Sequence, residues 1–446
     1  MKKSKLDEFI KSPYRALILL SIPVIASAIV ETLYTITDAV FVGRLGAEAL
    51  AAVTFAWPFF FILTALSLGL NAGISSRISR YLGEKNKRQA ENTAVHGILL
   101  ALLLAVVIAA LGIPWLRYIV GLTGASGQAL DMSTNYMLVV LLGIVSMFVS
   151  YVITSIFAAQ GDTKTAMKID IYSLVLNIAL SWLFIFVFRF GVVGSALAII
   201  TANTFALFQS LYFLRTKSYL TLRLRSFNYS PFILKEIVAV GFPSSLMMLV
   251  ASASAIFLDR VMVHFSVEHV AAFGLMSRLE SLSILPIYGL SVGAMTLTGM
   301  FYGAKQHKLL EDITWYAIKL GMAVATVISL VLFVFPEALL RMFTSDPAVL
   351  SVGIPFLRFY VITFPFSAAA MIIGRIMQGI GRGAPGLIVG VVRSLVIGIP
   401  LAYIFVFVFG FGYISVATAL IVSAVIGAGL GALWLARMLD HHHRKA

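Results

Sequence analysis

Twelve long apolar stretches occupy most of this chain and constrain its fold more than any other feature. They cover residues 16–42, 50–75, 93–113, 134–160, 168–188, 192–214, 238–264, 270–303, 313–335, 352–378, 384–409 and 413–436. About twenty apolar residues in a helix cross the hydrocarbon core of a bilayer. Only 12% of the 446 residues are charged, about half the share in soluble proteins. We therefore predict an all-α polytopic membrane protein with twelve transmembrane helices.

The basic residues lie mainly in the connections on one side of these stretches. Segments 1–15, 76–92, 161–168, 215–235, 304–312, 375–382 and 437–446 hold 24 of the 33 Lys and Arg, whereas the opposite loops hold Arg44, Arg117, Arg189 and Arg341. Because basic loops stay on the cytoplasmic side, we predict an inner-membrane protein with both termini in the cytoplasm. This pattern also accounts for the net charge of +14 without a nucleic-acid partner. The run 16–42 is too long for a signal peptide core, so we expect a retained first helix.

The two halves of the chain repeat each other at an offset of 220 or 221 residues. Ser21-Ile22-Pro23 matches Gly241-Phe242-Pro243, Asp38 matches Asp259, Gly161 matches Gly381, and Phe190-Gly191 matches Phe411-Gly412. We predict an N-lobe (1–214), a basic cytoplasmic linker (215–237), a C-lobe (238–437) and a cytoplasmic tail (438–446). Six spans per lobe make the lobes parallel, related by a pseudo-two-fold axis along the membrane normal. Such paired bundles are typical of transporters.

Ionisable residues inside the spans are candidates for function, because a charge at that depth is costly. Glu31, Tyr34 and Asp38 fall on one face of the first span. We predict that Asp38 is the principal cation-coupling residue; capping of the helix is the structural alternative. Asn177 and Ser181, four residues apart in the fifth span, would complete a coordination or relay network with Asp38, or serve as plain interhelical contacts.

The remaining polar and aromatic residues of the spans support weaker interpretations. In the second half, Asp259, Arg260, Arg278 and Glu280 are interpreted as structural ion-pairing residues, with Glu280 and Arg358 as one predicted pair. Phe55, Trp57 and Phe59 in the second span are candidates for lining a substrate cavity, although most aromatic residues must face lipid or other helices.

Several function classes lack their sequence motifs. The chain has no Walker motif, no metal-ligand spacing and no nucleophile–His arrangement. We therefore expect no enzyme activity, no metal site and no cofactor, and an ion gradient of H⁺ or Na⁺ as the energy source.

The ordered set of local motifs resembles the multidrug and toxic compound extrusion (MATE) family. The motifs are Ser21-Ile22-Pro23, Tyr34…Asp38-x-x-Phe41-Val42-Gly43-Arg44-Leu45-Gly46 with Ala51-Ala52, Gly161-Asp162-Thr163-Lys164, Asn177-Ile178-x-Leu180 and Gly191-x-x-Gly194-x-Ala196. The resemblance covers essentially the whole chain. It implies twelve helices in two lobes and export of organic cations against H⁺ or Na⁺.

Within that family the chain looks most like the DinF-like branch, in which an aspartate of the first helix couples cations; Asp38 occupies this place. The NorM-like branch uses acids in the seventh and tenth helices, and Met247–Ser254 of the seventh span contains none. The chain departs from the DinF-like pattern at Ser181, where relatives often have an acid. We hypothesise that Glu31 compensates for it.

The leading functional prediction is a proton-driven antiporter for hydrophobic and cationic drugs, acting as a monomer in the lipid bilayer. Two alternatives remain open. Na⁺ would suit the same oxygen ligands, and a lipid-precursor flippase of the same superfamily would share the fold, although such flippases usually have about fourteen spans.

Overall fold

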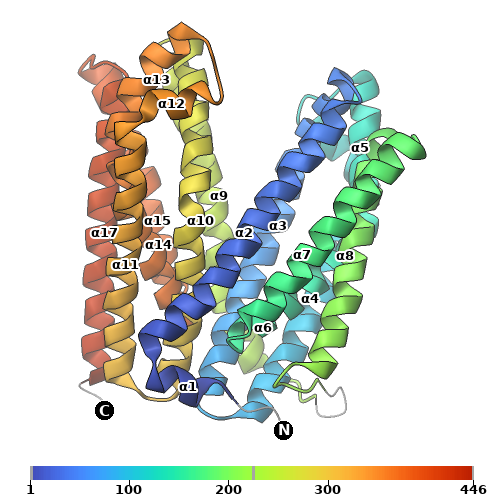
Figure 1. Ribbon diagram of the computed structural model, residues 1–446, viewed down its shortest axis with the longest axis vertical. Coiled ribbons are helices and arrows are strands. Elements are labelled where there is room, and N and C mark those ends of the chain that lie inside the picture. Colours follow the sequence, from blue (N-terminus) through green and yellow to red (C-terminus); the bar gives the residue numbers. More distant parts are fainter. Residues whose placement is uncertain (1–3, 223–226, 444–446) are drawn as a thin grey trace. The chain divides into compact units, whose positions relative to one another are not determined.

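The computed structural model describes residues 4–222 and 227–443, with side chains described as far as residue 440, and every regular element in these ranges is a helix (Figure 1). The predicted linker is described except for 223–226, so Arg223 and Arg225 lie outside the described residues. The helices of the first half are α1 (Leu6–Lys11), α2 (Pro13–Gly43), α3 (Ala47–Gly83), α4 (Lys87–Gly121), α5 (Gly127–Leu142), α6 (Ile144–Ala159), α7 (Thr163–Trp182), the π-helix η1 (Leu183–Val187) and α8 (Gly191–Thr216).

The helices of the second half follow the same order. They are α9 (Pro231–Val263), α10 (Val267–Gly303), α11 (His307–Val334), α12 (Pro336–Arg341), α13 (Pro347–Tyr360), α14 (Thr363–Gly379), α15 (Ala384–Val391), η3 (Val392–Gly398), α16 (Ile399–Tyr403), η4 (Ile404–Val408) and α17 (Ile414–His443). In the described ranges, ten helical segments are long and apolar enough to cross a membrane singly. The bent pairs α5–α6 and α13–α14 raise the number to twelve, as the sequence predicts.

The internal repeat extends to irregular details of the backbone. Helices α3 and α10 each contain 37 residues, and their first residues are Ala47 and Val267. The pairs α5–α6 and α13–α14 are each bent by 52°. The π-helices η1 and η4 are each five residues long and begin at Leu183 and Leu183's repeat position, Ile404. Since π-helical turns and sharp bends are rare, their recurrence at one offset indicates a duplicated architecture.

The chain divides into two compact units, and each unit combines a short segment near the N-terminus with one long segment. Unit 1 contains Met1–Asp7 and Pro23–Gly241, and unit 2 contains Glu8–Ile22 and Phe242–Ala446. Helices α2 and α9 are therefore each divided between the units, next to Pro23 and Pro243. A proline inside a helix removes one backbone hydrogen bond and favours a bend. The predicted lobes are two halves of the sequence with six spans each, whereas these units are groups of residues in contact. The predicted lobe boundaries therefore stay a prediction.

In unit 1, α6 is the central helix. It packs against α3, α4 and α8, and Phe148 and Phe157 on it are fully buried. In unit 2, α14 has the corresponding position and packs against α10, α11 and α17. These two helices each form the second member of a bent pair. In each bent span, the helix after the bend is therefore the one that packs at the centre of its unit.

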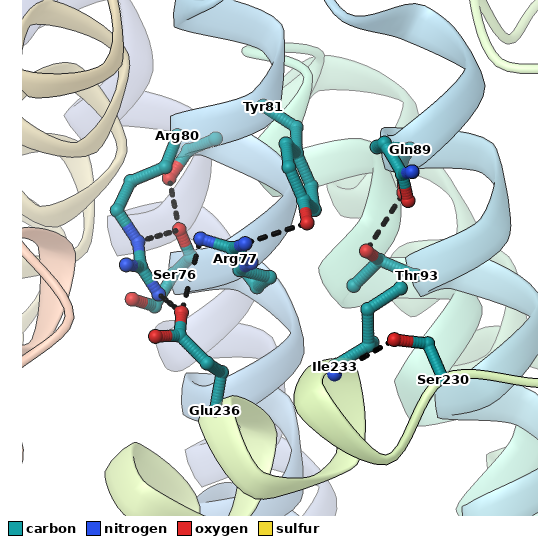
Figure 2. Close-up of polar contacts among 10 residues, drawn as sticks. Ser76, Arg77, Arg80, Tyr81, Gln89, Thr93, Ser230, Ile233 and Glu236 are labelled. Atoms are coloured by element: carbon teal, nitrogen blue, oxygen red, sulfur yellow. Dashed lines mark hydrogen bonds and ion pairs between the residues drawn. The ribbon is translucent and has the colours of Figure 1, made fainter.

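The first turns of α9 are held on α3 by a cluster of charged side chains (Figure 2). Arg77 Nη1 and Arg80 Nη2 lie 3.0 Å and 2.8 Å from Glu236 Oε2. Arg77 Nη2 also donates a hydrogen bond to the Tyr81 hydroxyl at 2.5 Å, and its guanidinium lies 3.9 Å from the centre of that ring. Arg77 and Arg80 are buried, so these two basic residues form ion pairs inside unit 1.

The backbones of α3 and α9 also approach each other very closely beside this cluster. A Cβ atom added to Gly73 would lie 2.2 Å from the carbonyl oxygen of Ile237, and one added to Gly241 would lie 2.8 Å from the carbonyl oxygen of Gly69. Both distances are far below van der Waals contact. Glycine is thus required at these two positions for the start of α9 to pack in unit 1.

Helix α4 holds the segment that leads into α9. Asn92 Nδ2 donates to the carbonyl of Asn228 at 2.8 Å, and the Asn228 N–H donates to Asn92 Oδ1 at 3.2 Å. The backbone N–H of Ser230 donates to His96 Nε2 at 3.0 Å. His96 is buried. The end of the linker is therefore a docked segment in unit 1.

Candidate functional site

Two polar stripes on α2 and α7 form the candidate site in unit 1. On α2, Glu31 and Asp38 are seven residues apart, which places them on one helix face. On α7, Asp170 and Asn177 are also seven residues apart. Contacts between the stripes occur at two levels, one around Asp38 and Asn177 and one around Glu31 and Asp170.

The level around Asp38 is a cluster of hydroxyl, amide and carboxylate groups. Ser195 Oγ on α8 donates a hydrogen bond to Asp38 Oδ1. Asn177 Nδ2 donates to the Tyr34 hydroxyl at 3.4 Å. Tyr136 on α5 makes a side-chain hydrogen bond with Ser195 and interacts electrostatically with Asp38. Ser195, Asn177 and Tyr136 are buried, whereas Asp38 is partly accessible.

Gly194, the residue before Ser195, allows the start of α8 to bring Ser195 to Asp38. A Cβ atom on Gly194 would lie 2.9 Å from the carbonyl carbon of Phe184. Gly194 therefore lets the first turn of α8 pack directly on the backbone of η1. This close packing, together with the position of α5, brings the hydroxyls of Ser195 and Tyr136 to the Asp38 carboxylate. Carboxylate and hydroxyl oxygens can bind a proton or a small cation.

The level around Glu31 contains a second carboxylate. Asp170 on α7 makes a side-chain hydrogen bond with Ser27 of α2 and interacts electrostatically with Glu31. Tyr151 on α6 interacts with both carboxylates. Glu31 is exposed and Asp170 is half-buried. Two carboxylates that face each other in this way repel when both are ionised, and they favour sharing a proton or a cation.

Of the residues named from the sequence, the structure brings Asp38, Tyr34 and Asn177 together and leaves Ser181 outside their hydrogen bonds. The Ser181 hydroxyl is buried and has no hydrogen-bond partner among the described residues. Glu31 lies at the second level, with Asp170. The roles of these five residues in cation coupling stay a prediction.

The second half has a different polar cluster, in unit 2. The Tyr360 hydroxyl donates to Glu280 Oε2 at 2.5 Å, and Glu280 interacts electrostatically with Arg393, which donates to Ser367 Oγ at 3.1 Å. The predicted pair of Glu280 and Arg358 is therefore wrong. Arg358 instead lies 5.9 Å from the ring centre of Phe333, because it faces the neighbouring helix α11.

The three aromatic residues named as cavity candidates do not form one cluster. Trp57 is 52% exposed and stacks on Phe60 with ring centres 6.2 Å apart. Phe55 and Phe59 are half-buried. Their contact with a substrate stays a prediction.

Comparison with known proteins identifies the family. The MatE family model matches residues 23–183 and 243–404, which is well over half of the chain. The chain belongs to the MATE family. The two matches begin at Pro23 and Pro243, so the family model detects the same duplication as the sequence and the backbone. A MATE family chain is a multi-pass membrane transporter, in agreement with the twelve apolar helices.

Relatives of this MATE chain include the Staphylococcus aureus (strain MRSA252) multidrug export protein MepA, 25% identical over 407 residues that cover 91% of this chain and 90% of that protein. A Shewanella oneidensis protein named FAD transporter is 26% identical and covers 87% of each. Among solved structures, an outward-facing multidrug resistance MATE transporter has a TM-score of 0.94 at 32% identity and full coverage of both chains. A Pyrococcus furiosus transporter described as having reverse polarity of its binding pocket has a TM-score of 0.94 at 31% identity, covering 99% of this chain and all of that one.

Sequence reasoning missed Ser195, Tyr136, Tyr151 and Asp170. No sequence pattern indicates Ser195 and the two tyrosines, because they reach α2 through the packing of segments that are distant in the sequence. Asp170 does have such a pattern. It is seven residues before Asn177 and therefore on the same helix face, but it is close to the predicted start of the fifth span and was not counted among the intramembrane charges.

Proposed function

We propose that this MATE family chain is a secondary active antiporter that exports hydrophobic and cationic organic compounds in exchange for H⁺ by alternating access. Asp38 is the coupling residue in this proposal. The supporting observation is the Asp38 cluster itself, in which one carboxylate on α2 is surrounded by Ser195, Tyr136, Tyr34 and Asn177. The names of the MepA relatives, multidrug export proteins, support the substrate class.

Protonation of Asp38 would change what its carboxylate can bind. An ionised carboxylate only accepts hydrogen bonds, whereas a protonated one also donates. The hydroxyls of Ser195 and Tyr136 would then have to reorient. Because α2 is divided between the two units at Pro23, a rearrangement around Asp38 acts on a helix that both units share, and it can favour one of two conformations.

Further parts of the proposal concern the setting of the protein. We expect both termini in the cytoplasm, on the basis of the distribution of Lys and Arg, and location in the inner cell membrane as a monomer. Na⁺ is the alternative coupling ion, because carboxylate, hydroxyl and amide oxygens suit it equally well. Export of a flavin nucleotide is an alternative for the substrate, because one relative is named an FAD transporter; a lipid-precursor flippase is a third possibility.

The test is efflux from proteoliposomes under pH and Na⁺ gradients that are imposed separately. Ethidium serves as the cationic probe and FAD as the anionic one. We expect ethidium efflux with a pH gradient alone, and its loss in Asp38→Asn. Asp259→Asn is the matched control, since Asp259 is the repeat equivalent of Asp38 and interacts with no partner shown for Asp38.

Three outcomes would overturn parts of the proposal. Ethidium efflux that follows only the Na⁺ gradient would replace H⁺ by Na⁺, and transport of FAD alone would replace the substrate class. Loss of efflux in Asp259→Asn with retention in Asp38→Asn would move the coupling site to the second half of the chain.

A further inference from the structure

A hollow of about 330 Å³ opens on unit 2, where the first turn of α2 lies against the first half of α11. Its lining consists of Tyr14, Glu311, Asp312, Trp315, Tyr316 and Lys319. The rings of Tyr14 and Tyr316 meet edge to face, with centres 4.6 Å apart. This hollow therefore combines three aromatic rings, two carboxylates and one ammonium group, and none of these residues belongs to the site in unit 1.

The lining residues of α11 are ordered by charge along the helix. The carboxylates of Glu311 and Asp312 come first, Trp315 and Tyr316 follow one turn later, and Lys319 comes after a further turn. With a rise of about 1.5 Å per residue, Asp312 and Lys319 are about 10 Å apart along the helix axis. The negative end is next to the α10–α11 turn, and the positive end is nearer the middle of the span.

Lys319 is an unusual residue for this position. It is exposed, and it makes no ion pair with any residue that the structure describes. Its position falls inside the apolar run 313–335. A lysine in a membrane span normally pairs with an anion or extends its ammonium group to the interface. Here the aromatic rings of Trp315 and Tyr316 lie between Lys319 and the carboxylates.

We propose that this hollow binds the headgroup of a phospholipid with a primary amine, such as phosphatidylethanolamine, in the cytoplasmic leaflet. The carboxylate of Asp312 receives the ammonium group, and Lys319 receives the phosphate. The order matches the lipid, because the amine of this headgroup extends further towards water than the phosphate. Trp and Tyr are the residues typical of that depth, and their rings also stabilise a cation.

The charge pattern selects against other occupants. An anionic headgroup without an amine, such as that of phosphatidylglycerol, offers no cation to the Asp312 carboxylate. A simple organic cation leaves Lys319 unpaired. Choline headgroups carry a cation but cannot donate a hydrogen bond to Asp312. The leaflet follows from the proposed topology, whereas the binding itself does not depend on the transport mechanism.

The test is native mass spectrometry of the full chain in detergent, with an equimolar mixture of dioleoyl phosphatidylethanolamine, phosphatidylcholine and phosphatidylglycerol. We expect the wild type to retain the ethanolamine lipid preferentially. Lys319→Gln and Asp312→Asn should each lower its bound fraction about fivefold, the effect expected for one partly exposed ion pair. Lys308→Gln is the matched control, since Lys308 is an exposed residue of the same helix outside the lining of the hollow.

Equal retention of the three lipids by the wild type would overturn the proposal, and so would unchanged retention in both variants. Competition by free phosphoethanolamine would show that a soluble compound, not a lipid, is the ligand. Should Lys319→Gln fail to fold, the wild type's preference for the ethanolamine lipid over the choline lipid still decides the question, because that comparison requires no variant.

Discussion

The Ser195 hydroxyl donates a hydrogen bond to Asp38 Oδ1 and thereby joins the start of α8 to the C-terminal half of α2. Tyr136 approaches the same two residues from α5. Asp38 therefore has partners on two other helices, which restrict both its position and the hydrogen bonds available to it. A carboxylate held in this way changes its surroundings when it gains or loses a proton, which is the property that coupling requires.

The first prediction concerns Ser195. Ser195→Ala removes the hydroxyl donor of Asp38, and we expect gradient-driven ethidium efflux to fall about tenfold, the effect of losing one hydrogen bond to a charged group. Ser195→Thr keeps the hydroxyl and should retain most of the activity. Initial efflux rates in proteoliposomes provide the measurement. Ser210→Ala is the control, because Ser210 is equally buried on α8 and, among the described residues, its hydroxyl donates to the backbone carbonyl of Leu207 and not to a carboxylate.

The second prediction concerns the carboxylates of Glu31 and Asp170. Because they interact, the effects of Glu31→Gln and Asp170→Asn on the free energy of unfolding should deviate from additivity by about 0.5–3 kcal/mol. Unfolding in detergent of the wild type, both single variants and the double variant gives this coupling energy. Glu31→Gln combined with Asp131→Asn should be additive, since Asp131 pairs with Arg117. Additivity of the first pair would show that the two carboxylates are independent.

The sequence predicts the architecture better than the site, for a physical reason. Span number, duplication and the face shared by Glu31, Tyr34 and Asp38 depend on local periodicity, which one chain displays. The partners of Asp38 and Glu280 depend on how distant helices pack. Glu280 thus pairs with Tyr360, 80 residues away, although Arg358 is only two positions from that tyrosine. Two residues that are two positions apart in a helix point to different faces, and no pattern in the sequence shows which face of α13 packs against Glu280.

The third prediction concerns Glu236, whose carboxylate binds both Arg77 and Arg80. Glu236→Gln removes the carboxylate that pairs with two buried guanidinium groups, and we expect a loss of about 1–3 kcal/mol in the free energy of unfolding. The pair of Arg117 and Asp131 is exposed on both sides, so Asp131→Asn should cost at most about 1 kcal/mol. Thermal unfolding of both variants in the same detergent tests this difference, and equal losses would mean that burial of the arginines contributes nothing.

The fourth prediction concerns Gly73, where α3 meets the start of α9. In Gly73→Ala the new methyl group would lie 2.2 Å from the carbonyl oxygen of Ile237, a backbone atom that cannot move away by a rotamer change. We expect a loss of about 1–3 kcal/mol in the free energy of unfolding, as for other overpacked interiors. Gly274→Ala on α10 is the control, because a Cβ atom there meets nothing within 4 Å. Alanine in an open helical position should stabilise the protein by up to about 1 kcal/mol, so opposite signs for the two variants are expected. A neutral Gly73→Ala would show that the start of α9 does not require this close packing on α3.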